Sequence, residues 1–150
     1  MAAALTAGTA MAASNNVRIS GLSDVAFGSV GNLAVDSISS QSICVYANTA
    51  INGYNVTASG SSSGGAFALA SGANRLSYEV QWSQSPGQSS GTQLNPNVAL
   101  TGLVSTATQQ NCNSGPAASA SLILIVRSTI ASSAAAGSYS GTLSLVVGPE

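Results

Sequence analysis

Apolar side chains occupy every second position over several stretches of this chain, and no other feature limits its fold as strongly. In residues 76–82, Leu, Tyr, Val and Trp alternate with Ser, Glu and Gln. Successive side chains of a β-strand point to opposite faces, so this spacing predicts a strand with one buried and one solvated face. The same alternation recurs in residues 53–58 and 66–69.

Clusters of turn-forming residues separate these stretches. Gly, Ser, Asn and Pro concentrate in residues 60–65, 71–74, 83–91 and 113–116. Short strands separated by such turns indicate an all-β sandwich or barrel. No amphipathic helix longer than one or two turns is predicted after residue 16.

Two later segments carry further information about the sheet. Residues 121–127 are apolar on both faces of the predicted strand, which indicates a central strand covered on each side. Residues 139–147 return to alternation before Gly148-Pro149-Glu150. The far edge of this closing strand must pair with an earlier strand, be shielded, or stay open to another chain.

The composition excludes several functions. The chain has three basic and four acidic side chains, and it contains neither Lys nor His. A Ser-His-Asp or Cys-His nucleophile needs an imidazole base and a P-loop needs its Lys, so none of these sites can form. Three Arg and a net charge of −1 cannot neutralise a nucleic-acid backbone. We expect neither an enzyme nor a nucleic-acid-binding protein.

Ser and Thr are unusually abundant, with 28 and 10 residues, yet 45% of the chain is apolar. Disordered chains have low hydrophobicity, so this chain is expected to fold. Exposed strand faces rich in hydroxyl groups are a habit of secreted β proteins.

The N-terminal run MAAALTAGTAMAAS consists of small and apolar residues. Ala10-Met11-Ala12 has the small-x-small form that signal peptidase reads, which predicts cleavage between Ala12 and Ala13. We expect residues 1–12 to be the remnant of a secretory signal peptide and residues 13–150 to form a single β-sandwich domain. The alternative is a short Ala-rich helix that belongs to the domain.

Cys44 and Cys112 are the two cysteines of the chain. In an oxidising compartment, an even pair without other metal ligands nearby predicts one disulfide. Such a crosslink stabilises a folded domain by roughly 4 kcal/mol. Two reduced, buried thiols in a cytosolic protein are the alternative.

The remaining candidates for chemistry are few, and no catalytic, metal-binding or cofactor-binding residue is predicted. Nothing in the spacing of Asp24, Asp36 and Glu79 brings two carboxylates together, and Glu79 is expected to be solvated on the polar face of its strand. Arg75 and Arg127 could pair with these acids. Trp82 could serve as a sugar-stacking platform, but it shares a face with other apolar residues, which favours a place in the core.

Five segments in this order resemble one family, the spore coat protein U-like pilins of archaic chaperone-usher fimbriae. They are residues 17–28 (VRISGLSDVAFG), 43–46 (ICVY), 64–67 (GGAF), 76–82 (LSYEVQW) and 137–145 (GSYSGTLSL). The resemblance implies an immunoglobulin-like β-sandwich that is incomplete because it lacks its final strand. In that family a periplasmic chaperone lends the missing strand, and the N-terminal extension of the next subunit later replaces it by donor-strand exchange.

The resemblance also assigns roles to residues at both ends of the chain. Pilins of chaperone-usher systems tend to carry a Gly fourteen residues from the end, followed by alternating apolar residues. The corresponding acceptor groove and closing strand would comprise Gly137, Tyr139, Gly141, Leu143, Leu145 and Val147. Val17, Ile19 and Gly21 alternate as a donor segment should, although the same residues could instead form the first strand of the domain.

We therefore expect a structural subunit of a secreted surface fimbria, exported through the periplasm, that assembles by donor-strand exchange through a periplasmic chaperone and an outer-membrane usher. Its partners would be neighbouring pilin subunits, the chaperone and the usher, with no small-molecule substrate and no cofactor. The alternative is a self-contained adhesive or carbohydrate-binding β-sandwich module, alone or at a fibre tip. That module would need an exposed cleft in loops such as residues 83–97.

Overall fold

The structure, a computed structural model, describes residues 15–28 and 32–150. The signal peptide predicted for residues 1–12, and the cleavage site between Ala12 and Ala13, lie outside the described residues. The described chain is almost entirely β, with one short α-helix and one 3-10 turn. Its elements are β1 (Asn16–Ser20), β2 (Ser37–Asn48), β3 (Gly53–Gly60), η1 (Ser63–Gly65), β4 (Ala68–Ser71), β5 (Asn74–Ser77), β6 (Glu79–Ser83), β7 (Thr92–Gln93), β8 (Leu100–Val104), β9 (Ala120–Val126), α1 (Ser128–Ser133) and β10 (Leu143–Pro149).

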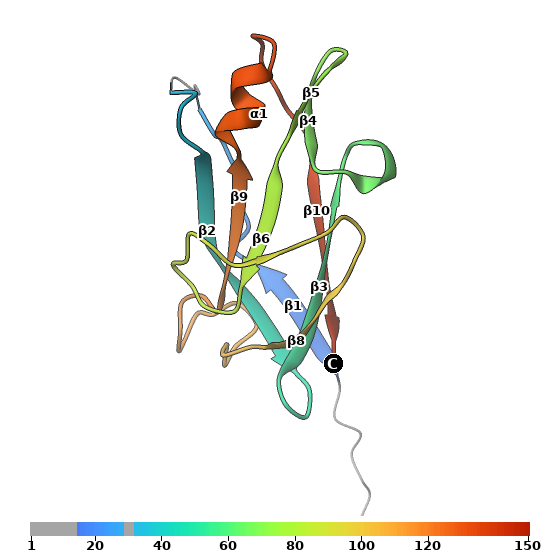
Figure 1. Cartoon of the computed structure of the whole chain (residues 1–150). Coiled ribbons are helices and arrows are strands. Elements are labelled where there is room, and N and C mark those ends of the chain that lie inside the picture. Colours follow the sequence, from blue (N-terminus) through green and yellow to red (C-terminus); the bar gives the residue numbers. More distant parts are fainter. Residues whose placement is uncertain (1–14, 29–31) are drawn as a thin grey trace, which may run out of the picture.

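Two antiparallel sheets pack face to face (Figure 1). The larger sheet has the order β1-β2-β9-β6-β7, the smaller has the order β10-β3-β8, and β4 pairs with β5 in a separate hairpin. The hairpin and α1 lie at one end of the sandwich, and the C-terminus lies at the other. The predicted all-β, immunoglobulin-like class is thereby confirmed. No helix in the described residues is long and apolar enough to cross a membrane.

The central strand of the larger sheet is β9, as the apolar run at residues 121–127 predicts. It pairs with β2 on one side and β6 on the other. Leu122, Leu124 and Val126 point into the core between the sheets, whereas Ile123 and Ile125 are buried on the opposite face. A strand buried on both faces explains why its sequence does not alternate.

The alternating stretch at residues 76–82 is divided between β5 and β6 by Tyr78. The backbone N–H of Tyr78 still follows the β4–β5 register and donates to the carbonyl of Phe67 at 3.0 Å, whereas from Glu79 the chain pairs with β9. All four apolar side chains of the stretch are nevertheless buried, as the alternation predicts. Trp82 is 1% exposed, and its indole N–H donates to the Tyr54 hydroxyl at 3.1 Å, which confirms its place in the core.

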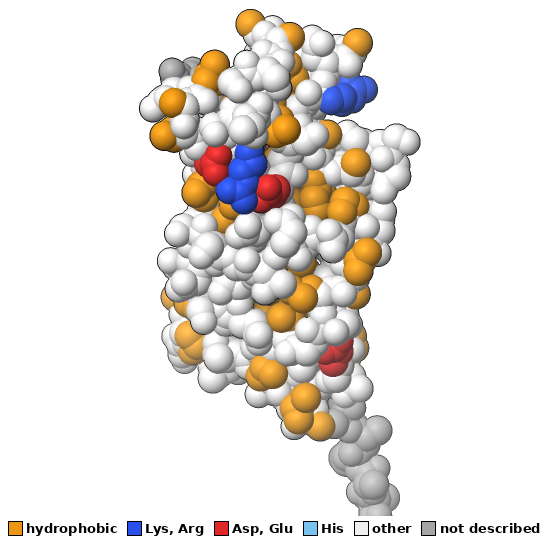
Figure 2. Space-filling model, in the orientation of Figure 1, with side chains coloured by type: hydrophobic (Ala, Val, Ile, Leu, Met, Phe, Trp, Pro, Cys, Tyr) orange, Lys and Arg blue, Asp and Glu red, His pale blue; other side chains and the backbone are white. Residues whose placement is uncertain are grey.

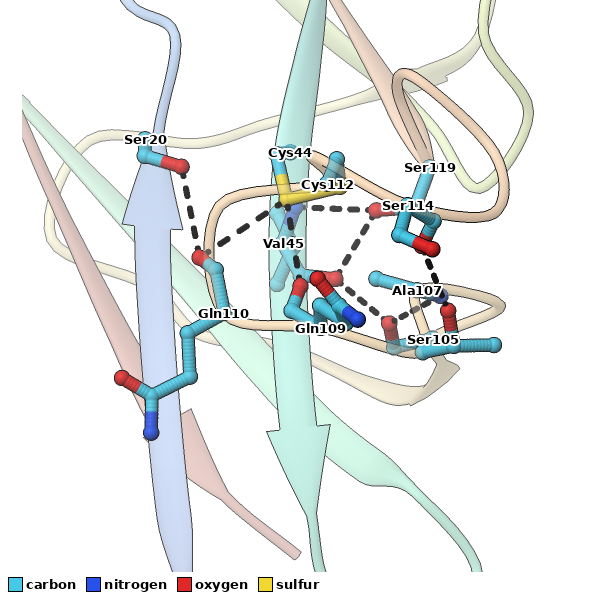
Figure 3. The surroundings of a disulfide bond; sticks show 11 residues. Ser20, Cys44, Val45, Ser105, Ala107, Gln109, Gln110, Cys112, Ser114 and Ser119 are labelled. Atoms are coloured by element: carbon cyan, nitrogen blue, oxygen red, sulfur yellow. Dashed lines mark hydrogen bonds between the residues drawn. A yellow bond between two sulfur atoms is a disulfide. The ribbon is translucent and has the colours of Figure 1, made fainter.

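Cys44 and Cys112 form the predicted disulfide. Cys44 lies in β2, and Cys112 lies in the loop between β8 and β9 (Figure 3). The bond holds that loop over the outer side of the larger sheet. There the carbonyl of Gln110 accepts a hydrogen bond from the Ser20 hydroxyl at the end of β1, at 3.5 Å.

Buried serine hydroxyls complete the backbone pairing of β2 where β9 stops. The β2–β9 ladder ends at Ile43, so the peptide groups of Val45 have no strand partner from β9. The Ser119 hydroxyl accepts the N–H of Val45 at 2.8 Å and donates to its carbonyl at 2.8 Å. The Ser105 hydroxyl donates to the same carbonyl, and both serines are buried (Figure 3). A buried peptide group without a partner would be destabilising, so these hydroxyls are structural.

A cluster of three charged side chains joins β2, β6 and β9 on the outer face of the larger sheet. Arg127 contacts Asp36 at 2.8 Å and Glu79 at 2.6 Å. The Glu79 pair uses two parallel N–H···O bonds, and the second Asp36 oxygen accepts the N–H of Ser128. Arg127, one of the two Arg that could pair with these acids, does so, and Glu79 remains partly solvated with its side chain 35% exposed. The spacing of the acids did not indicate that one guanidinium would bond two of them, because strand register brings together positions far apart in sequence.

The charged cluster changes the acidity of all three groups. The pKa of Asp36 lies below its ordinary value because the Ser128 N–H and the Arg127 guanidinium bond to its carboxylate. Hydrogen bonds from Arg127 likewise lower the pKa of Glu79, and the two carboxylates raise the pKa of Arg127.

Elsewhere on the face shown in Figure 2 charged side chains are sparse, and separate apolar areas lie among uncharged polar side chains.

We expect Ser119→Ala to lower the free energy of unfolding by about 1–3 kcal/mol, because the buried N–H of Val45 loses its partner. Urea unfolding followed by tryptophan fluorescence measures the change. Ser144→Ala is the matched control, since Ser144 is exposed on β10. Equal stabilities of the two variants would contradict the structural role of Ser119.

The charged cluster predicts a loss of stability in acid. Carboxylates whose folded pKa is lowered stabilise the fold above their ordinary pKa values of 3.8 and 4.5, and this contribution disappears as pH falls through the lowered values. We expect the free energy of unfolding to fall between about pH 5 and about pH 2, and Arg127→Gln to flatten that dependence. Arg75→Gln is the control, because Arg75 bonds only to backbone carbonyls. A slope in Arg127→Gln as steep as in the control would refute this origin.

Candidate functional site

A groove of about 1110 Å³ opens along one side of the sandwich, between an N-terminal and a C-terminal segment of the chain. Its floor comes from apolar side chains of the core, contributed by β4, β5, β9 and the Tyr78 junction. One wall is residues 22–28, and the other is residues 137–145. The floor residues are Leu69, Leu76, Tyr78, Leu122, Leu124 and Val126.

Alternation on β10 shapes the second wall. Leu143 and Leu145 are half-buried and line the groove, whereas Ser144 and Val146 point outward, and Val146 is 65% exposed. Val147 packs against the core but does not line the groove. β10 is bonded to β3 along its length, so one of its edges is already used.

The closing strand is shorter at its start than residues 139–147 predict, since β10 begins at Leu143. Tyr139 lines the groove from the preceding loop, where its hydroxyl donates to the carbonyl of Ala135 at 2.8 Å. Ser140 instead exchanges two backbone hydrogen bonds with Ala70 of β4, at 2.8 and 3.0 Å. Alternation alone predicts a continuous strand from Tyr139. In the structure Ser140 bonds to the β4–β5 hairpin instead, so β10 begins only at Leu143.

Gly137 and Gly141 allow this segment to approach the hairpin closely. A Cβ at Gly137 would lie 2.7 Å from the Ser71 hydroxyl oxygen, and one at Gly141 would lie 3.2 Å from a Leu69 methyl carbon. Both glycines line the groove, and a larger side chain at either position would require the neighbouring Ser71 or Leu69 side chain to shift.

The first wall follows β1 in the chain. Val17 and Ile19 lie in β1, which pairs with β2 of the same chain from Asn16 to Ser20, and both pack against the core. Of the two roles left open for these residues, the structure has them as the first strand. Gly21 ends the strand with a φ of +80°, a conformation that favours glycine.

Beyond Gly21 the chain continues beside the groove without strand pairing. Val25 and Phe27 are half-buried and pack against the core, while Asp24 and Ala26 between them are exposed. These wall residues were missed as site residues in the sequence analysis. Their alternation continues that of Val17 and Ile19 and was the available signal.

The groove is suited to binding apolar groups and backbone. Among the described residues, Asp24 is the one charged residue that lines it, and Asp24 is exposed. Burial raises the pKa of Tyr78, so its hydroxyl stays neutral at physiological pH. In residues 15–28 and 32–150, no group of three His, Cys, Asp or Glu could hold a metal ion. Trp82 is buried and presents no face to a sugar.

Comparison with known proteins supports the fold. No family model matches the chain, and no curated protein matches it. Among solved structures, it is similar to a chain from work described as "Chaperone-tip adhesin complex is vital for synergistic activation of CFA/I fimbriae biogenesis", with a TM-score of 0.55 and 16% sequence identity. The match covers 90% of this chain and 43% of the other, so this chain spans less than half of its length. At this identity the likeness establishes the fold alone, an immunoglobulin-like β-sandwich.

Proposed function

We propose that this chain is a structural subunit of a surface fimbria, and that its groove accepts an extended segment of a partner protein. The observation that carries the proposal is the apolar groove between residues 22–28 and residues 137–145. We propose a structural role and not an enzymatic one, with non-covalent assembly as the activity.

An extended segment suits this groove better than a small molecule does. The groove is slightly larger than the roughly 300–1,000 Å³ of typical small-ligand pockets, and its floor in the described residues is mostly apolar. A β-strand placed in it would direct alternate side chains onto the floor, and its peptide groups would face the edges of both walls. Burial of apolar floor and pairing of backbone would then occur in one step.

The structural neighbour and the disulfide favour this reading. The work on the neighbour concerns a chaperone and tip adhesin of CFA/I fimbriae. We propose corresponding partners for this chain: other pilin subunits, a periplasmic chaperone and an outer-membrane usher, with donor-strand exchange as the assembly reaction. The spore coat protein U-like subtype belongs to the same proposal. The Cys44–Cys112 disulfide fits a periplasmic or surface location, because disulfides persist in oxidising compartments.

The proposed role of this chain is that of an acceptor. Val17 and Ile19 are engaged in β1 of their own domain, so the donor in this proposal is a segment of another subunit or a strand of the chaperone. That donor would carry apolar side chains at alternate positions.

Adjacent residues on β10 offer a matched test of the groove. The probe is a fluorescently labelled synthetic peptide in which Val alternates with Thr, with Lys at both ends, here named the alternating probe. We expect Leu145→Asp to weaken its binding at least tenfold, because a charge on the groove side of this wall would be desolvated, and Val146→Asp to leave binding unchanged. Fluorescence anisotropy measures the affinity.

Two controls accompany this test. Non-reducing electrophoresis and circular dichroism verify that both variants keep the disulfide and the β fold. A second peptide with Ser in place of each Val tests the need for apolar side chains. Failure of the wild-type chain to bind the alternating probe, or equal binding by both variants, would argue against the groove as the assembly site.

A further inference from the structure

The Gln41 side chain connects β2 to the chain beyond β1, at a point where the two backbones have separated. The ladder pairs Asn16 with Asn48 and runs to Ser20 opposite Cys44. Continued in the same register, it would place Ser23 opposite Gln41. No backbone pair forms there, because Gly21 turns the chain away from β2 with its positive φ.

Three hydrogen bonds join Gln41 to Ser23 across this wider gap. The side-chain carbonyl of Gln41 accepts the Ser23 N–H at 3.0 Å and the Ser23 hydroxyl at 3.0 Å. Its amide N–H donates to the Ser23 carbonyl at 3.3 Å. A primary amide has the same donor and acceptor groups as a peptide unit, so the side chain can bond both the N–H and the carbonyl of Ser23.

The hydrogen bonds between Gln41 and Ser23 hold the groove wall in position. The wall stands off from β2 by the length of a glutamine side chain, and Gln41 itself lines the groove. Both peptide groups of Ser23 are bonded to the Gln41 side chain. Beyond this point Val25 and Phe27 rest on the core, which orients the wall along the groove.

We propose that Gln41 is a positioning residue that holds the wall of residues 22–28 at the spacing at which an inserted strand can contact both walls. The proposal rests on the function proposed above. It concerns the geometry of the groove and assigns Gln41 no contact with the incoming strand. Without the clamp, the contacts that hold the wall in the described residues would be the packing of Val25 and Phe27 on the core.

The test compares Gln41→Met with Gln81→Met in the full chain. Both glutamines are half-buried on the larger sheet, and Gln81 clamps a different loop by accepting the N–H of Gly91 at 3.0 Å. Met keeps the length of the side chain and removes the amide. The alternating probe reports binding, NMR-detected hydrogen exchange at the Ser23 amide reports the clamp, and the urea midpoint reports stability.

We expect Gln41→Met to weaken probe binding about tenfold and to speed exchange at Ser23, while its urea midpoint shifts no more than that of Gln81→Met. Gln81→Met should bind the probe as the wild type does. Gln41→Glu keeps an acceptor for both Ser23 donors, so its affinity should lie closer to the wild type than that of Gln41→Met.

The outcomes separate the two proposals. Probe binding by the wild type with no loss in Gln41→Met, or an equal loss in both Met variants, overturns the positioning role and leaves the groove function intact. If Gln41→Met exchanges faster at Ser23 but the wild-type chain does not bind the probe, the groove function is overturned, and with it the role of Gln41 in binding.

Discussion

The sheets of this sandwich are not closed over one another on the side where β1 ends, and the main features of the molecule depend on that constraint. The β1–β2 ladder stops at Ser20, and residues 22–28 then run beside the core without strand pairing. β10 is bonded to β3 on its other side. The apolar floor between them is therefore reached from solvent through a groove, whereas a strand at this position would close the sandwich.

Side chains bond backbone groups at two places beyond the end of a ladder on β2. Ser119 serves both peptide groups of Val45 beyond the end of β9, and Gln41 serves Ser23 beyond the end of β1. Hydroxyl and primary amide groups can donate and accept together, which suits them to this task. Uncharged polar side chains such as Ser thus have a structural role in this chain. A charged side chain in these positions could not both donate and accept a hydrogen bond.

Charge acts locally in this fold. Arg127, Asp36 and Glu79 gather at the ends of β2, β6 and β9, close to α1, and leave the groove itself nearly uncharged. A single surface ion pair contributes little to stability. Here one guanidinium bonds two acids, and Asp36 also accepts the Ser128 N–H, so the cluster connects β6, the start of β2, the end of β9 and α1. A groove with an apolar floor and little charge suits the proposed binding of backbone and apolar side chains.

The sequence alone determined the all-β class, the buried face of residues 76–82, the double burial of β9 and the disulfide. The pattern of apolar residues can be read within a single strand, and two cysteines allow only one pairing. The sequence also indicated the apolar alternation of Leu143 and Leu145. Only the tertiary structure decided that β10 starts at Leu143, that Val147 lies outside the groove, that Val25 and Phe27 belong to its wall, and that Arg127 joins two acids. The place of Val25 and Phe27 depends on how an unpaired segment packs on the core. The others depend on contacts between segments distant in sequence, and period-two alternation carries no information on which residue lies opposite which.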